Sequence, residues 1–229
     1  MSKPLISVII PAYNEEQSIG KVVNDIPRNI VEHVIVVNNN STDSTVEVAK
    51  KAGAIVLDEP RRGYGWACLK GIAHSKTLNT EIVVFLDGDY SDYPQEIPDV
   101  IAPILETDMD MVIGSRVLGK REKGSLTPQQ VFGNWLATRL IRLFYRAKFT
   151  DLGPFRAIKA ESLEKLKMAD KTYGWTIEMQ IKAAKHKMKF CEVPVNYKKR
   201  IGVSKVSGTI KGTVLAGIKI IFAVFKYRF

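Results

Sequence analysis

The chain has 229 residues, which is enough for one large or two small domains with a real core. Hydrophobic residues make up 45% and charged residues 25%, as in ordinary globular proteins, but the formal net charge of +10 favours an anionic partner. Cys68 and Cys191 lie far apart, which argues against a disulfide framework or a zinc site and suits a reducing compartment. No stretch approaches the roughly 20 apolar residues that span a bilayer, and no signal peptide is recognisable, so we expect a cytoplasmic protein.

Short apolar runs alternate with helical patterns along the first half of the chain. Apolar residues repeat at helical spacing over Ile19–Ile26 and again over Val46–Ala49, where Asn40 or Ser41 is expected to cap the helix and Gly53 to end it. Strand followed by helix at intervals of roughly 20 to 30 residues predicts an α/β fold with a mostly parallel central sheet flanked by helices. The expected strands are Leu5–Ile10, Val34–Val37, Ala54–Leu57, a central run ending at Leu86, and Met111–Ile113.

The central run begins at Glu81 and ends abruptly in carboxylates. A continuous apolar run of this length is typical of a strand that is buried on both faces of a parallel sheet. Ligands of such sheets bind beyond the carboxyl ends of the strands, where Asp87 and Asp89 would lie. Two hard oxygen ligands on either side of Gly88 suit Mg²⁺ or Mn²⁺ that bridges to substrate phosphates. The alternative is a solvated Asp-Gly turn, which is common after a strand.

Polar clusters follow other predicted strands as well, and four clusters at the same end of one sheet indicate a binding crevice. The glycine-rich segment Arg61–Ala67 lacks the third glycine of a dinucleotide fingerprint, and the chain has no GxxxxGK[ST] phosphate loop. A dinucleotide-dependent dehydrogenase is therefore disfavoured.

Five motifs occur in a fixed order: Pro11–Glu15, Asn39–Asp43, Arg62–Ala67, Asp87–Asp89 and Gly114–Arg116. Together they resemble the nucleotide-diphospho-sugar domain of GT-A glycosyltransferases of family 2. The closer resemblance is to dolichyl-phosphate mannose synthases and bacterial polyprenyl-phosphate glycosyltransferases. It extends through Glu192–Val195 and Arg200–Lys205, and so covers about Leu5 to Lys205.

The resemblance implies a donor site and a metal site at matching positions. A divalent cation, Mg²⁺ or Mn²⁺, would stabilise the charge that develops on the leaving diphosphate. The implied metal ligands are Asp87, Asp89 and Ser91. The implied nucleotide-sugar ligands are Pro11, Ala12, Tyr13, Glu15, Asn39, Ser41, Asp43, Arg62, Gly63, Gly65, Asp87 and Gly88.

The second half of the chain carries the residues expected to serve the acceptor. A phosphate acceptor is already ionised near neutral pH and needs cations to hold it, for which Arg116, Arg156, Arg200 and Lys205 are candidates. Each of these could instead be a solvated surface charge. A hydroxyl acceptor would need a carboxylate base, for which Glu178 is the candidate. The alternative for Glu178 is a charge that interacts with the dipole at a helix N-terminus.

Two stretches combine an apolar stripe with a basic stripe, as interfacial helices do. Between Pro128 and Phe149, one face carries Leu136, Leu140, Leu143 and Phe144, and another carries Arg139, Arg142 and Arg146. The tail from Thr209 to Phe229 aligns Lys211, Lys219 and Lys226 on one face of an otherwise apolar helix. An ordinary amphipathic helix packed on the domain is the alternative for each stretch. We expect a GT-A domain over residues 1–208 and a C-terminal amphipathic helix over 209–229 that contacts an anionic membrane surface.

The predicted function is metal-dependent and inverting transfer of a hexose from GDP-mannose or UDP-glucose to a polyprenyl phosphate, at the cytoplasmic face of the membrane. Transfer to a soluble or glycan hydroxyl is the alternative. A nucleotide-sugar binding module without turnover is disfavoured by the intact Asp87, Asp89, Arg200 and Lys205. A nucleic-acid partner is also disfavoured, because the basic residues form no single run and the carboxylates would repel a phosphate backbone.

Overall fold

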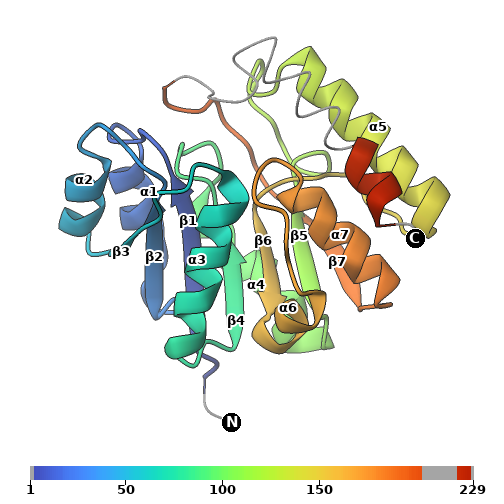
Figure 1. Ribbon diagram of the computed structural model, residues 1–229, viewed down its shortest axis with the longest axis horizontal. Helices are drawn as coiled ribbons and strands as arrows, with labels where there is room; N and C mark the ends of the chain where they lie inside the picture. The colour runs from blue at the N-terminus through green and yellow to red at the C-terminus, as the bar shows by residue number, and fades with distance from the viewer. Residues whose placement is uncertain (1–2, 203–220, 228–229) are drawn as a thin grey trace.

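The computed structural model describes residues 3–202 and 221–227, and a seven-stranded sheet runs through its centre (Figure 1). The strand order is β3-β2-β1-β4-β6-β5-β7, and β6 is the one strand of this sheet that runs antiparallel to its neighbours. The mostly parallel sheet predicted from the sequence is therefore confirmed. The strands are β1 (Ile6–Ala12), β2 (His33–Asn38), β3 (Ile55–Asp58), β4 (Ile82–Phe85), β5 (Met111–Ser115), β6 (Arg156–Lys159) and β7 (Phe190–Pro194).

Helices cover both faces of the sheet and bury two separate apolar clusters against it. On one face lie α1 (Ile19–Asp25), α2 (Thr45–Lys51) and α4 (Ile97–Thr107), the last preceded by the 3-10 turn η1 (Pro94–Glu96). On the other face lie α3 (Tyr64–Thr77), α5 (Pro128–Tyr145), α6 (Ala160–Leu166) and α7 (Trp175–Lys185).

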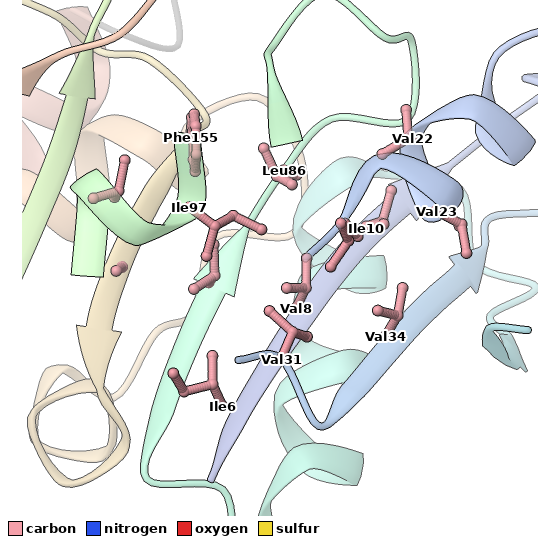
Figure 2. Packing of buried hydrophobic residues seen from close by; sticks show 14 of the residues in the cluster. Ile6, Val8, Ile10, Val22, Val23, Val31, Val34, Leu86, Ile97 and Phe155 are labelled. Atoms are coloured by element: carbon pink, nitrogen blue, oxygen red, sulfur yellow. The ribbon is translucent and has the colours of Figure 1, made fainter. Parts of the chain in front are cut away.

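Strand β1 contributes side chains to both apolar clusters. All seven of its residues are buried, with Ile6, Val8 and Ile10 in one cluster and Ile9 in the other. Figure 2 shows the first three packed in the cluster that also holds Val22 of α1. Because side chains alternate across a strand, a strand that is covered on both faces needs an unbroken apolar run. Full burial of each such side chain contributes about 1.5–3 kcal/mol.

The start of α2 differs from the prediction. Its N-cap is Ser44, not Asn40 or Ser41. Ser41 lies in the preceding turn instead, where its hydroxyl accepts a hydrogen bond from the Asn14 backbone N–H at 3.0 Å. The predicted end was right, since Gly53 follows the last helical turn in the left-handed region, with φ +85°.

Helix α5 confirms the helix expected after Pro128 and begins with a capping box between Thr127 and Gln130. Of the predicted apolar face, Leu143 is 71% exposed and so is not covered by the domain. Arg146 ends the helix with a positive φ of 55° and so does not extend the basic stripe. Large apolar residues that the pattern did not single out are exposed on the same helix: Val131, Phe132 and Trp135.

Residues 221–226 form a helical segment beside α5, the red ribbon in Figure 1. Residues 209–220 and 228–229 of the predicted C-terminal helix lie outside the described residues, as do Lys205 and the expected domain boundary at 208. Within the described ranges, none of the helices has both the length and the apolar character that crossing a bilayer requires.

Two helical glycines provide a test of this packing. Gly71 of α3 faces the sheet, and a Cβ added there would lie 2.5 Å from Cγ2 of the buried Ile9, whereas a Cβ at Gly133 of α5 would meet nothing within 4 Å. Alanine is favoured over glycine in a helix by about 1 kcal/mol, so Gly133→Ala should raise the free energy of unfolding by up to that amount. Gly71→Ala should instead lower it by about 1–3 kcal/mol through overpacking. Urea denaturation of both variants measures the difference, and equal effects would contradict the close α3–β1 contact.

Candidate functional site

A pocket of about 340 Å³ opens at the carboxyl ends of β1, β2 and β4. Each of these strands delivers its C-terminal residues to the same edge of the sheet, as expected for an open parallel sheet. Most of the predicted nucleotide-sugar ligands meet here, together with Tyr64 and Tyr173, which were not predicted. The lining residues are Pro11, Ala12, Tyr13, Glu15, Asn39, Arg62, Gly63, Tyr64, Asp87, Gly88, Asp89, Tyr173 and Arg200.

Three carboxylates, Glu15, Asp87 and Asp89, and one guanidinium dominate the chemistry of the pocket. Arg200 bridges two acids, with Nη1 3.2 Å from Asp89 Oδ2 and Nη2 3.1 Å from Glu15 Oε1. Asp87 accepts a hydrogen bond from the Tyr64 hydroxyl at 3.1 Å. Burial and the neighbouring charge of Asp89 raise the pKa of Asp87 to about 7, against the opposite effects of Tyr64 and Arg200. The pocket therefore holds crowded negative charge that favours a cation.

Ser91 serves Asp89 rather than the pocket surface. Its backbone N–H donates to Asp89 Oδ1 at 2.9 Å, and its hydroxyl donates to the same oxygen. Ser91 is fully buried and does not line the pocket. The structure thus gives this predicted metal ligand the role of orienting Asp89.

A fourth acid, Asp92, is buried near Asp87 and Asp89 and was missed by the sequence reasoning. It is 2% exposed, and neither carboxyl oxygen has a hydrogen-bond partner in the described part of the chain. Burial, followed by the charges of Asp87 and Asp89, raises the pKa of Asp92 well above its usual value. The sequence signal was present, since Asp92 follows the Asp-Gly-Asp motif by three residues.

Other predicted ligands hold the loops that frame the pocket. Asn39 lines the pocket, but its amide group is bonded on both sides, donating to Arg61 O at 2.8 Å and accepting from Gly63 N at 2.8 Å. Asp43 accepts backbone hydrogen bonds from Glu16 and Thr45, away from the pocket. Ser41 contacts the 14–16 turn in the same way.

Gly65 is buried at the first turn of α3 and does not line the pocket. A Cβ at Gly65 would lie 2.0 Å from the Asp170 backbone oxygen. At Gly63 the distance would be 2.2 Å, to the Lys171 oxygen. These two glycines therefore let the backbone of residues 170–171 approach the start of α3 closely.

The structure places two of the predicted acceptor-side arginines, Arg116 and Arg156, outside the pocket lining. Arg116 forms a bidentate pair with the buried Asp151, with Nε–Oδ2 2.8 Å and Nη2–Oδ1 2.7 Å, outside the pocket lining. Arg156 is fully buried in β6, where its guanidinium donates to backbone oxygens, including Thr176 O at 3.1 Å, and where burial lowers its pKa to about 10. Neither arginine lines the pocket, and Arg200 is the one predicted acceptor cation among the described residues that does.

Glu178 is not placed to act as a base. It is completely buried at the start of α7, where it accepts hydrogen bonds from the backbone N–H groups of Ala169 and Asp170 and pairs with Lys182 at 2.7 Å. Its oxygens are therefore committed to the protein, outside the pocket. The position of Glu178 in the helix alone could not predict this burial, because acidic residues are common in the first turn of a helix.

The family model described as "Glycosyl transferase family 2" matches residues 7–167, which include β1 to β6 and the Asp87–Asp89 motif. The chain belongs to glycosyl transferase family 2. This family 2 glycosyltransferase thus places residues of four motifs, among them Asp87 and Asp89, at the pocket edge that the sheet topology creates.

Relatives match the family 2 glycosyltransferase over nearly its full length. An uncharacterized glycosyltransferase of Mycobacterium tuberculosis is 33% identical over 219 residues, covering 94% of this chain and 96% of the relative. A UDP-N-acetylglucosamine–dolichyl-phosphate N-acetylglucosaminyltransferase of Methanococcus voltae is 28% identical, covering 85% of this chain and 86% of the relative.

Solved structures share the fold. Glucosyl-3-phosphoglycerate synthase from Mycobacterium tuberculosis, in complex with Mn²⁺, UDP and phosphoglyceric acid, superposes with a TM-score of 0.80. The similarity covers 98% of this chain and 78% of that one at 23% sequence identity. The GT-A fold predicted from the motifs is therefore confirmed.

The contrast between Arg116 and Arg200 is testable by stability. Arg116→Ala leaves the 1% exposed Asp151 without its partner, which should lower the free energy of unfolding by about 3–5 kcal/mol. Arg200→Ala removes a side chain that is 27% exposed and leaves two acids at the edge of an open pocket, where they can be hydrated, so the cost should be smaller than at Arg116. Urea denaturation at pH 7 measures both changes.

The pH dependence provides a check on the Arg116 result. Burial alone would raise the pKa of Asp151, but Arg116 holds it below its usual value. A lowered folded-state pKa contributes stability above the unfolded pKa of about 4, and this contribution is lost as the pH falls through the folded-state value. The gap between wild type and Arg116→Ala should therefore shrink in acid. A constant gap would show that the ion pair is not its source.

Proposed function

We propose that this glycosyltransferase moves a hexose from a nucleotide-diphosphate sugar to a polyprenyl phosphate, with inversion, at the cytoplasmic face of a membrane. The observation that carries the proposal is where the acidic side chains lie relative to the pocket. Glu178, the predicted base, is buried elsewhere, and the acids that line the pocket are Glu15, Asp87 and Asp89. A hydroxyl acceptor needs a base, whereas a phosphate acceptor arrives ionised and needs a cation.

The donor side rests on Asp87 and Asp89. Among the described residues no group of three or more His, Cys, Asp or Glu side chains could hold an ion alone, so Mg²⁺ or Mn²⁺ would need diphosphate oxygens beside these carboxylates. These carboxylate oxygens fit a metal ion, because Asp89 Oδ2 already faces a positive charge, that of Arg200. A bound ion would neutralise charge on the leaving diphosphate. Glucosyl-3-phosphoglycerate synthase, which shares the fold, has been solved with Mn²⁺ and UDP and with Mg²⁺ and UDP, and these complexes support the assignment.

On the acceptor side, Arg200 is the cation that we assign to the phosphate. Its Nε is buried without a hydrogen-bond partner in the described part of the chain, while the two terminal nitrogens contact Asp89 and Glu15. A guanidinium at this point can hold an incoming phosphate next to the sugar and offset the charge of both groups. The dolichyl-phosphate named for the Methanococcus voltae relative supports a lipid phosphate.

An exposed apolar surface on α5 supports a lipid carrier for that phosphate. Phe132 is 61%, Trp135 51% and Leu143 71% exposed, and the exposed Arg139 lies over the Trp135 ring at 5.7 Å. Aromatic and basic side chains together are typical of surfaces that bind anionic lipid head groups. A hollow of about 430 Å³ lined by Arg121 and Lys123 adjoins the start of this helix.

Transfer assays test the proposed function. GDP-mannose, UDP-glucose and UDP-N-acetylglucosamine, each labelled in the sugar, are incubated with a short polyprenyl phosphate and Mn²⁺ or EDTA. We expect label in the organic phase with one donor, dependent on metal. Asp89→Ala should reduce the rate by at least about a hundredfold, because the charge on the leaving group is no longer offset.

Asp99→Ala is the matched control, since Asp99 lies on α4 away from the pocket, and it should leave the rate unchanged. Metal-dependent hydrolysis of the donor without organic-phase product would contradict the lipid acceptor and point to a soluble one. Full activity of Asp89→Ala would remove the assigned metal role.

Membrane contact is tested separately by flotation with vesicles that contain anionic lipid. Phe132→Ser combined with Trp135→Ser should reduce binding by about tenfold or more, because burial of each aromatic ring contributes about 1.5–3 kcal/mol. Leu105→Ser is the control, since Leu105 is 52% exposed on α4, on the opposite side of the sheet. Equal flotation of all three proteins would assign the α5 surface to another role.

A further inference from the structure

We propose that Tyr227 is a positioning residue for the donor pocket, acting through the buried Glu178 on the loop of residues 169–174. This inference rests on the proposed donor role of the pocket. Glu178 connects the C-terminal segment to the loop of residues 169–174, because it forms hydrogen bonds with both.

The first contact is between Glu178 and the loop. The Glu178 carboxylate accepts hydrogen bonds from Ala169 N at 3.0 and 3.2 Å and from Asp170 N at 2.7 Å. It is completely buried, and its charge is balanced by Lys182. A buried carboxylate with several donors is a fixed point, because losing any one of them leaves an unpaired charge in an apolar setting.

The loop in turn forms one wall of the donor pocket. Asp170 Oδ1 accepts from Thr172 N at 2.7 Å and from Gly174 N at 3.1 Å, which shapes the turn that carries Tyr173. Tyr173 lines the pocket. On the other side, Lys171 O accepts from Trp66 N at 3.2 Å, in the first turn of α3. A shift at residues 169–170 would therefore move the pocket wall.

The second contact links Glu178 to the C-terminal segment. The Tyr227 hydroxyl donates to Glu178 Oε1 at 2.8 Å. The segment before it is docked on α5, where Val224 is fully buried and Phe225 lies 5.3 Å from Phe144, ring centroid to centroid. Figure 1 shows this red segment next to α5, with α7 alongside.

A second tyrosine provides a matched control for the same segment. Tyr145 of α5 donates its hydroxyl to the Val224 backbone oxygen, so Tyr145→Phe loosens the C-terminal segment without touching Glu178. Tyr227→Phe removes the bond to Glu178 and keeps the ring. The two variants therefore separate general loosening of the segment from loss of the anchor.

The experiment uses the full chain and two measurements. Calorimetric titration with UDP or GDP in the presence of Mn²⁺ gives nucleotide affinity, and hydrogen–deuterium exchange reports the amides of Ala169 and Asp170. Tyr227→Phe should weaken binding by about three- to tenfold and speed exchange at these two amides, as expected for loss of one hydrogen bond to a charged group. Tyr145→Phe should leave both values near wild type.

Unchanged exchange at Ala169 and Asp170 in Tyr227→Phe would overturn the inference, and so would equal changes in the two variants. If the wild type bound neither nucleotide, the proposed donor role would fail. The exchange measurement would still decide whether Tyr227 holds the loop.

Discussion

Crowded negative charge at the carboxyl edge of a buried parallel sheet is the constraint on which the site depends. Strands β1 and β4 are covered on both faces, so Asp87 and Asp89 emerge at a place with little water to screen them. Burial, together with the charge of Asp89, raises the pKa of Asp87 to about 7. Arg200 offsets part of this charge by contacting Asp89 and Glu15 together. The site is therefore built to accept a cation and a phosphate-bearing ligand at one point.

The fold and the donor edge could be predicted because their signals are local. An unbroken apolar run identifies a doubly covered strand, and the Asp87–Asp89 motif follows directly from it. The roles of the acceptor-side residues could not be predicted, because they depend on side chains that are distant in sequence. Arg116 is neutralised by Asp151, 35 residues away, which an isolated Gly114–Arg116 motif does not indicate. Periodicity likewise finds the α5 helix but not which of its apolar residues the core leaves exposed.

For Glu178, the family resemblance indicated an acid at this position, and the structure shows which contacts that acid makes. The resemblance places an acid at this position, and its proximity to a helix start left base and dipole roles open. In the structure the acid accepts hydrogen bonds from the loop that carries Tyr173, and it lies outside the pocket lining. The acids at the pocket face Arg200 and Tyr64, which is why we propose an acceptor that arrives already ionised.

A structure with Mn²⁺ and the preferred nucleoside diphosphate would test the central claim most directly, because anomalous scattering locates the ion independently of the protein atoms. We predict the ion between Asp89 and the diphosphate oxygens, with the nucleoside packed against Tyr13 and Arg62 at the pocket mouth. An ion bound elsewhere, or a nucleotide seated outside this edge of the sheet, would contradict the account.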